Sequence, residues 1–295
     1  MAYSSPGVDW LATNSNIDGS IHLASDIATP PQSTSEAIRA FHLLDELPPA
    51  GISESLAFID AVSHHTTEYL SRKVISKTHI NEDVSNLVAE LLTHHNSDGG
   101  FGDLPGYAST VIDTAFALEA LVFAGQISNE SARAAVSYLF SKQAVDGSWQ
   151  DNGIQSPIYI TALVIQVLTP FKQTFLDVEG IISHGVVYLT DQRNASGLWG
   201  EVYLSALSLI AVLPNVSDIT SMQSSIDTFL STQQLNGSWG DDVYQTALAL
   251  RARYVIDTAL MDPTLSEIQG SVVDAQTGMP LANVHVTLTG STNES

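Results

Sequence analysis

The 295-residue chain contains no cysteine. Without a thiol it cannot form disulfides or a thioester, use a cysteine nucleophile, or hold zinc through thiolates. This absence excludes several kinds of covalent and metal chemistry, and it leaves the cellular compartment open.

Basic residues are scarce as well. Ten lysines and arginines stand against 32 aspartates and glutamates, which gives a net charge of -22. Nucleic acids and anionic membranes bind cationic surfaces, so neither is an expected partner. We interpret the acidity as an aid to solubility, with weak Ca²⁺ binding by the acidic turns as the alternative. No apolar run reaches the roughly 18 residues of a membrane span, which predicts no membrane insertion.

Short turns centred on glycine recur along the chain. They read IDGSIH (17–22), SDGGFG (97–102), VDGSWQ (145–150), ASGLWG (195–200) and LNGSWG (235–240). Their glycines are spaced by about 40 to 50 residues, except for a first gap of about twice that length, so one copy of the repeat has degenerated. Asp or Asn before Gly is typical of a left-handed turn that ends a helix.

Two kinds of helix flank these turns. Amphipathic segments precede the later turns, with apolar residues every three or four positions, as in a helix with one buried face. These segments are 85–95, 132–143, 182–192 and 222–234. Segments that are apolar on most sides follow the turns: 36–44, 114–125, 160–168, 204–213 and 245–256. Residues 52–77 supply helical material for the degenerate unit.

The repeat predicts an all-α fold for residues 1–262. Hairpins of one amphipathic and one apolar helix bury their surfaces only by stacking. Since the second helices are apolar all round, we expect a closed ring with these helices inside, an α/α-toroid of about six hairpins. The turn aromatics are expected to be buried between hairpins, with carbohydrate stacking as the alternative; they are Phe101, Trp149, Trp199 and Trp239.

Residues 263–295 change character. Two alternating, strand-like runs surround a turn at Thr277-Gly278 and Pro280, which predicts the start of a truncated β-domain.

The helix-turn-helix unit of residues 8–260 resembles the prenyltransferase and squalene-oxidase repeat. That repeat occurs in terpenoid cyclases, protein prenyltransferase β-subunits and the thioester domains of alpha-2-macroglobulin-like proteins. The tail, with the pattern G-x-V-x-D-x-x-T-G-x-P-L, resembles a carboxypeptidase-regulatory-like domain. This second resemblance implies a larger extracellular or cell-surface protein, although no signal peptide is visible at the start of the chain.

The residues that carry enzymatic chemistry in these families are missing. In class II terpene cyclases a D-x-D-D-T-A motif donates a proton from its central acid, and the matching stretch is Thr110-Val111-Ile112-Asp113-Thr114-Ala115. Ile112 stands in the donor's place, so Asp113 is a catalytic candidate only if the chain is an enzyme. The zinc and thioester chemistries need cysteine, which is absent. Whether the chain is an enzyme stays open.

The starts of the inner helices offer a ligand site instead. Polar side chains stand there at corresponding places: Asp113, Tyr159, Tyr203 and Tyr244. In a toroid they would meet at one mouth of the central lumen and could bind a small molecule; the alternative is that the tyrosines only pack on their neighbours. No metal or cofactor is expected, because the histidine pairs 64–65 and 94–95 have poor chelating geometry and no nucleotide-binding glycine motif occurs.

Two functions follow from these observations. The first is a non-catalytic α/α-toroid module of a secreted or cell-surface protein that binds a small ligand, glycan or protein. The second is a terpene-cyclase-like or carbohydrate-active enzyme on the same fold. A lumen with an acid beside aromatic walls would favour the cyclase, and a lumen filled by side chains would favour the module.

Overall fold

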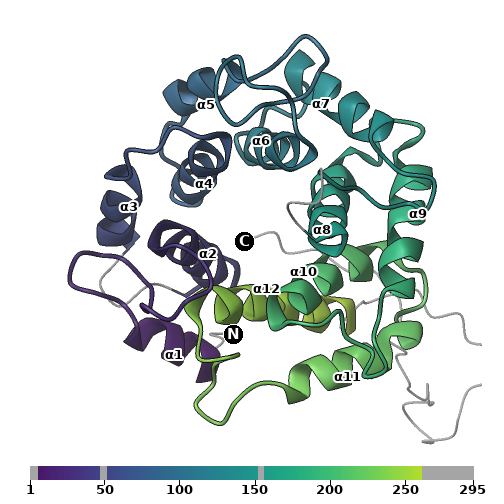
Figure 1. Ribbon diagram of the computed structural model, residues 1–295. Coiled ribbons are helices and arrows are strands. Elements are labelled where there is room, and N and C mark those ends of the chain that lie inside the picture. Colours follow the sequence, from purple (N-terminus) through teal and green to yellow (C-terminus); the bar gives the residue numbers. More distant parts are fainter. Residues whose placement is uncertain (1–5, 47–51, 152–155, 261–295) are drawn as a thin grey trace, which may run out of the picture. The chain divides into compact units, whose positions relative to one another are not determined.

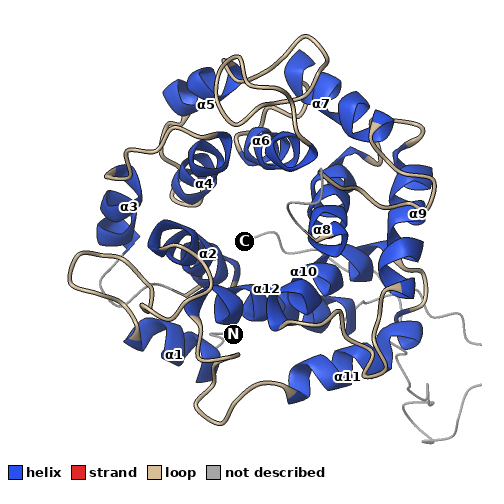
Figure 2. Ribbon diagram, viewed as in Figure 1, coloured by secondary structure: helices blue, strands red, loops and turns tan. Residues whose placement is uncertain are grey.

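The computed structural model describes residues 6–46, 52–151 and 156–260, and all the regular elements in this part of the chain are helices. They form two concentric layers (Figure 1, Figure 2). The outer helices are α1 (Pro6–Thr13), α3 (Ile52–Asp60), α5 (Ser85–Leu92), α7 (Glu130–Ser141), α9 (Val178–Asp191) and α11 (Gln223–Ser231). The inner helices are α2 (Pro30–Leu43), α4 (Thr67–Thr78), α6 (Val111–Phe123), α8 (Pro157–Leu168), α10 (Val202–Val212) and α12 (Val243–Leu260).

Alternation of outer and inner helices gives six hairpins, so the predicted α/α-toroid is confirmed. Helices α3 and α4 occupy the degenerate unit. Short 3-10 turns, Thr169–Phe171, Leu213–Asn215 and Ile219–Met222, follow α8 and α10 and precede α11.

The first and last hairpins close the ring. Helix α12 packs against both α10 and α2. Two aspartates accept backbone hydrogen bonds across the seam. The Val243 amide donates to Asp26 at 2.8 Å, and the Ile27 amide donates to Asp242 at 2.7 Å. Closure explains why the inner helices are apolar on most sides.

The recurring turns adopt the predicted left-handed conformation. Gly147, for example, has φ +88°, and a Cβ placed on it would lie 2.3 Å from the His184 carbonyl oxygen of the next outer helix. Gly237 makes the same approach to the Pro6 carbonyl at the ring seam. Each of these turns is thus both a helix end and a contact with the following hairpin.

The turn aromatics are buried, as predicted. Phe101, Trp149 and Trp239 have no exposed surface and Trp199 has 2%. The Trp149 amide donates to the Thr161 hydroxyl of the inner helix at 2.9 Å, and its indole N–H donates to the Leu139 carbonyl at 2.7 Å. Burial excludes carbohydrate stacking by these four side chains.

The expected β segment, residues 263–295, lies outside the described residues. Helix α12, Val243–Leu260, is the last described element, and the boundary expected at 262 stays a prediction. Within the described ranges, every helix is too short or too polar to cross a membrane.

Candidate ligand site in the ring

The centre of the ring, which we call the lumen, is lined by all six inner helices. Its walls are Ser35, Glu36, Arg39, Ser71, Arg72, Ile75, Phe116, Glu119, Tyr159, Leu163, Gln166, Leu207, Tyr244, Leu248 and Arg251. These side chains leave a free volume of about 20 Å³, which is room for roughly one water molecule. The lumen is therefore filled, not open.

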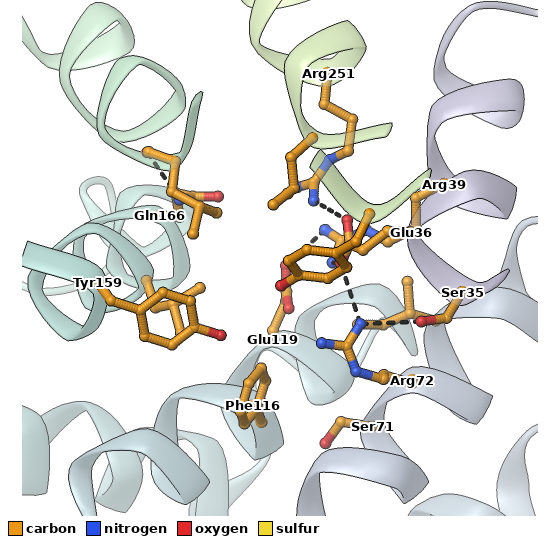
Figure 3. A pocket seen from close by; sticks show the side chains of 15 residues that line it. Ser35, Glu36, Arg39, Ser71, Arg72, Phe116, Glu119, Tyr159, Gln166 and Arg251 are labelled. Atoms are coloured by element: carbon orange, nitrogen blue, oxygen red, sulfur yellow. Dashed lines mark hydrogen bonds and ion pairs between the residues drawn. The ribbon is translucent and has the colours of Figure 1, made fainter. Parts of the chain in front are cut away.

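Charged side chains do much of the filling. Figure 3 shows arginines from three helices around Glu36. The Glu36 carboxylate lies 2.5 Å from Arg251, 3.2 Å from Arg72 and 3.5 Å from Arg39. Arg39 also pairs with Glu119 at 2.7 Å, and the network continues from Arg72 to Glu68 at 2.9 Å.

This network is charged at physiological pH. Burial alone would raise the pKa of Glu36, but Arg251, Arg39 and Arg72 outweigh it and lower that pKa to about 2. Burial opposes the charge of Arg39 as well, and Glu119 and Glu36 nevertheless raise its pKa. Because ionised side chains are costly to bury against apolar groups, this lumen is unfavourable for an apolar ligand.

This ion network around Glu36 was not predicted from the sequence. A signal was present: Glu36 and Arg39 are three residues apart on one inner helix, and Arg251 interrupts an apolar one. Their meeting depends on ring closure, which joins α2 to α12.

A second cavity lies where several inner helices begin; we call it the tyrosine mouth. Its volume is about 320 Å³, and its lining residues are Ile27, Ala28, Gln32, Tyr159, Tyr203 and Tyr244. The rings of Tyr159 and Tyr203 lie 6.3 Å apart, edge to face. The structure thus brings together the tyrosines proposed for ligand binding, while binding itself stays a prediction.

Asp113, the fourth proposed residue, does not line the tyrosine mouth. The buried hydroxyls that bind the turn amides set the register: Trp149 donates to Thr161 and Phe101 donates to Thr114. Tyr159 stands two residues before its threonine, and the equivalent place in α6 is Ile112. Asp113 is one residue further on, about 100° around the helix.

Gln32 takes that place in α2, two residues before Thr34, which binds the Ile21 amide. It is the polar lining residue that was not predicted from the sequence, and Ile27 and Ala28 are the two apolar ones. Alignment of the repeats on these hydroxyls would have found Gln32.

Asp113 lies in the first turn of α6. The first two amides of this helix, those of Val111 and Ile112, donate to Asp151 of the next turn at 2.9 and 2.8 Å. Asp113 instead accepts a 2.6 Å hydrogen bond from the Thr110 hydroxyl. Burial raises its pKa to about 6, with smaller contributions from Asp103, Asp151 and Glu68.

The two histidine pairs lie in different surroundings. His64 and His65 are exposed, whereas His94 is buried and its Nδ1 lies 2.8 Å from the Thr67 hydroxyl. No group of metal-ligating side chains occurs within residues 6–46, 52–151 and 156–260. Three of the turn carboxylates, Asp18, Asp98 and Asp146, accept hydrogen bonds from backbone amides of their own turns.

Comparison with known proteins finds similarity to terpene cyclases. The family model of the squalene-hopene cyclase C-terminal domain matches residues 69–166. Drimenyl diphosphate synthase of Streptantibioticus cattleyicolor is 28% identical over 169 residues, which are 51% of this chain and 31% of that protein. The alignment thus spans about a third of the curated relative.

Solved structures agree at the level of the fold. A variant of the type II terpene cyclase MstE from Scytonema, in complex with geranylgeranyl dihydroxybenzoate, has a TM-score of 0.69 at 13% identity, covering 86% of this chain and 96% of that chain. A protein from Actinoplanes has a TM-score of 0.66 at 16% identity, covering 85% and 98%. The described part of this chain has the terpenoid-cyclase-like α/α-toroid fold.

Proposed function

We propose that this toroid is a non-catalytic module that binds a small neutral ligand, such as a sugar ring of a glycan, at the tyrosine mouth. The observation that carries the proposal is a cavity of about 320 Å³, lined by Tyr159, Tyr203 and Tyr244, above a lumen with only about 20 Å³ of free space. Cavities that bind small molecules measure about 300–1,000 Å³.

The lining favours a neutral partner. Among the described residues around this cavity none is charged. The tyrosine rings offer apolar faces and their hydroxyls offer hydrogen bonds. The Gln32 amide is already bonded, since its Nε2 donates to Glu68 and its Oε1 accepts from Thr29. Burial raises the pKa of Tyr159 and of Tyr244, so both keep their protons as donors near neutral pH.

The test is a titration of the full chain with mono- and oligosaccharides, followed by saturation-transfer NMR. We expect Tyr203→Ala to weaken binding at least about tenfold, because an aromatic wall of the cavity is lost. Tyr107→Ala is the matched control, since Tyr107 is 57% exposed and lies in a turn away from the cavity. Equal binding by both variants, or no saccharide binding at all, would overturn the proposal.

A terpene-cyclase-like activity is the second candidate. It is favoured by the family match over residues 69–166, which include Asp113, and by the pKa of about 6 of that carboxyl. Two features speak against it: Ile112 replaces the expected acid, and the filled lumen has no room for a prenyl chain.

We also propose that the toroid belongs to a secreted or cell-surface protein. The support is the resemblance of residues 263–295 to a carboxypeptidase-regulatory-like domain. Labelling of intact cells with an antibody against the toroid tests this location, and a signal only after lysis would contradict it.

A further inference from the structure

The opposite end of the ring holds a cavity of different chemistry. It lies near the C-terminal ends of inner helices, has a volume of about 490 Å³, and we call it the histidine mouth. Its charged, imidazole and aromatic lining residues are Arg39, His42, His79, Phe123, Arg251 and Tyr254. Arg39 and Arg251 line both this cavity and the lumen, so the ion network forms its floor.

The charged side chains that line the histidine mouth are all of one sign. The described lining includes two arginines and no carboxylate, although the whole chain carries -22. Glu36 and Glu119, which pair with these arginines, line the lumen instead. The charged groups that face the cavity are therefore cationic, while their carboxylate partners lie on the lumen side, and this arrangement suits an anionic ligand.

Only some of the N–H donors of Arg251 are used within the described residues. Its side chain is only 10% exposed, and its single hydrogen bond within the described ranges runs from Nη1 to Glu36. A guanidinium carries five N–H donors in a fork that matches a carboxylate or phosphate. A buried, partly unused fork at the floor of a cavity suits the head group of an anion.

The two histidines form the polar wall. Their rings stack with centroids 4.1 Å apart, and Nε2 of His79 is buried without a hydrogen-bond partner. Burial lowers the pKa of His79 to about 3, and His42, Arg39 and Arg251 contribute to the shift. His79 is therefore neutral near pH 7, and the stacked imidazole rings give this wall a polar, uncharged surface.

The rim is aromatic. Phe123 is 40% exposed and Tyr254 is 37% exposed, and both line the cavity. The Arg39 guanidinium already lies 5.5 Å from the Phe123 ring centre. Exposed aromatic side chains beside a cavity are a common sign of a binding site.

We infer that the histidine mouth binds a small aromatic anion. Its carboxylate or phosphate lies toward Arg39 and Arg251, and its ring lies between Phe123 and Tyr254. This site is independent of the neutral site proposed at the tyrosine mouth, because the two cavities share no lining residue.

Calorimetric titration of the full chain with 2-naphthoate, 2-naphthyl phosphate and 2-naphthalenemethanol tests the inference. We expect both anions, or the one whose head group fits, to bind at least about tenfold more tightly than the alcohol, since only they pair with the arginines. An equal affinity for the alcohol, or no binding by either anion up to about millimolar concentration, would overturn it.

Variants locate the site. Arg251→Gln should weaken anion binding about tenfold or more, whereas Arg253→Gln removes the same charge from the same helix outside the cavity and should change it less than about twofold. Equal losses in these two variants would show general electrostatic attraction and contradict the site.

Two further variants do not disturb the ion network. Tyr254→Ala should weaken naphthoate binding about fivefold, because it removes the exposed rim ring. Tyr203→Ala, at the other mouth, should leave naphthoate binding unchanged. The reverse pattern would place the anion at the tyrosine mouth and overturn the inference, whatever the outcome for saccharides.

Discussion

Asp113 illustrates how a single residue departs from the repeat. Aligned by sequence alone, it stands among the tyrosines; aligned by the hydroxyls that bind the turn amides, it falls one residue beyond them. A shift of one residue turns a helical side chain by about 100°, which is enough to move it out of the cavity. The tyrosines were predictable because each stands two residues before a Ser or Thr of the repeat, whereas Asp113 stands one residue before Thr114.

The raised pKa of Asp113 gives a dependence of stability on pH. Its folded pKa is about 6, whereas the ordinary pKa of an aspartate is 3.8, so the folded state holds the proton more tightly than the unfolded state. Stability therefore falls as pH rises between these values, and the cost is complete above about pH 6, on the order of 2–3 kcal/mol.

Asp113→Asn should remove this cost while keeping an oxygen that accepts from Thr110. We expect the variant to be about 2–3 kcal/mol more stable than the parent at about pH 7.5 and nearly equal to it at about pH 4. Urea denaturation at the two pH values is the measurement. A variant that is less stable at both would show that the charged form is favoured in the fold.

At the scale of the element, the sequence predicted the hairpins well and their boundaries less well. The glycine turns and the three-to-four spacing located every flanking helix from α5 onward. Helix α2 begins at Pro30, six residues before the expected segment, because its first turn is polar and carries no apolar pattern. Helix α1 was not separately predicted, since eight residues with Val8 and Leu11 as buried apolar positions give little periodicity.

The turn glycines should resist substitution for two separable reasons. Gly147→Ala combines a left-handed φ with a clash against the His184 carbonyl, whereas Gly106→Ala has φ +81° and open space around it. We expect a loss of about 1–2 kcal/mol for Gly106→Ala and distinctly more for Gly147→Ala. Thermal and urea unfolding of both variants are the measurements; similar losses would mean that the contact between hairpins contributes nothing.

The turn tryptophans should contribute strongly to the free energy of unfolding. Replacing Trp149, Trp199 or Trp239 with Ala should destabilise by about 3–5 kcal/mol, as for other large buried aromatics. The check is denaturant titration of the three variants. A loss below about 1 kcal/mol at any of them would contradict its burial.

For the whole molecule, ring closure decides what the lumen becomes. Glu36, Arg72 and Arg251 are far apart in sequence and meet only because the ring joins α12 to α2 and α4 lies beside α2. No local pattern could have predicted this. The closed ring was predicted from the apolar inner helices, but the charged filling of its centre was not.

Breaking the ion network should be costly. Glu36→Gln leaves buried arginines without their shared carboxylate, and we expect a loss of about 3–5 kcal/mol in urea denaturation. The control is Glu179→Gln, because Glu179 is an exposed glutamate in the first turn of α9; it should change stability by less than about 0.5 kcal/mol. If the two variants unfolded alike, the network would not hold the lumen closed.

We propose that this toroid binds ligands at its mouths and does not perform cyclase chemistry in its lumen. The most direct measurement is incubation of the pure protein with squalene and with geranylgeranyl diphosphate, followed by mass spectrometry of the products. We predict that both substrates are recovered unchanged, because Ile112 cannot donate a proton and about 20 Å³ cannot hold a prenyl chain. A cyclic product that disappears in Asp113→Asn would contradict the account and make Asp113 the catalytic acid.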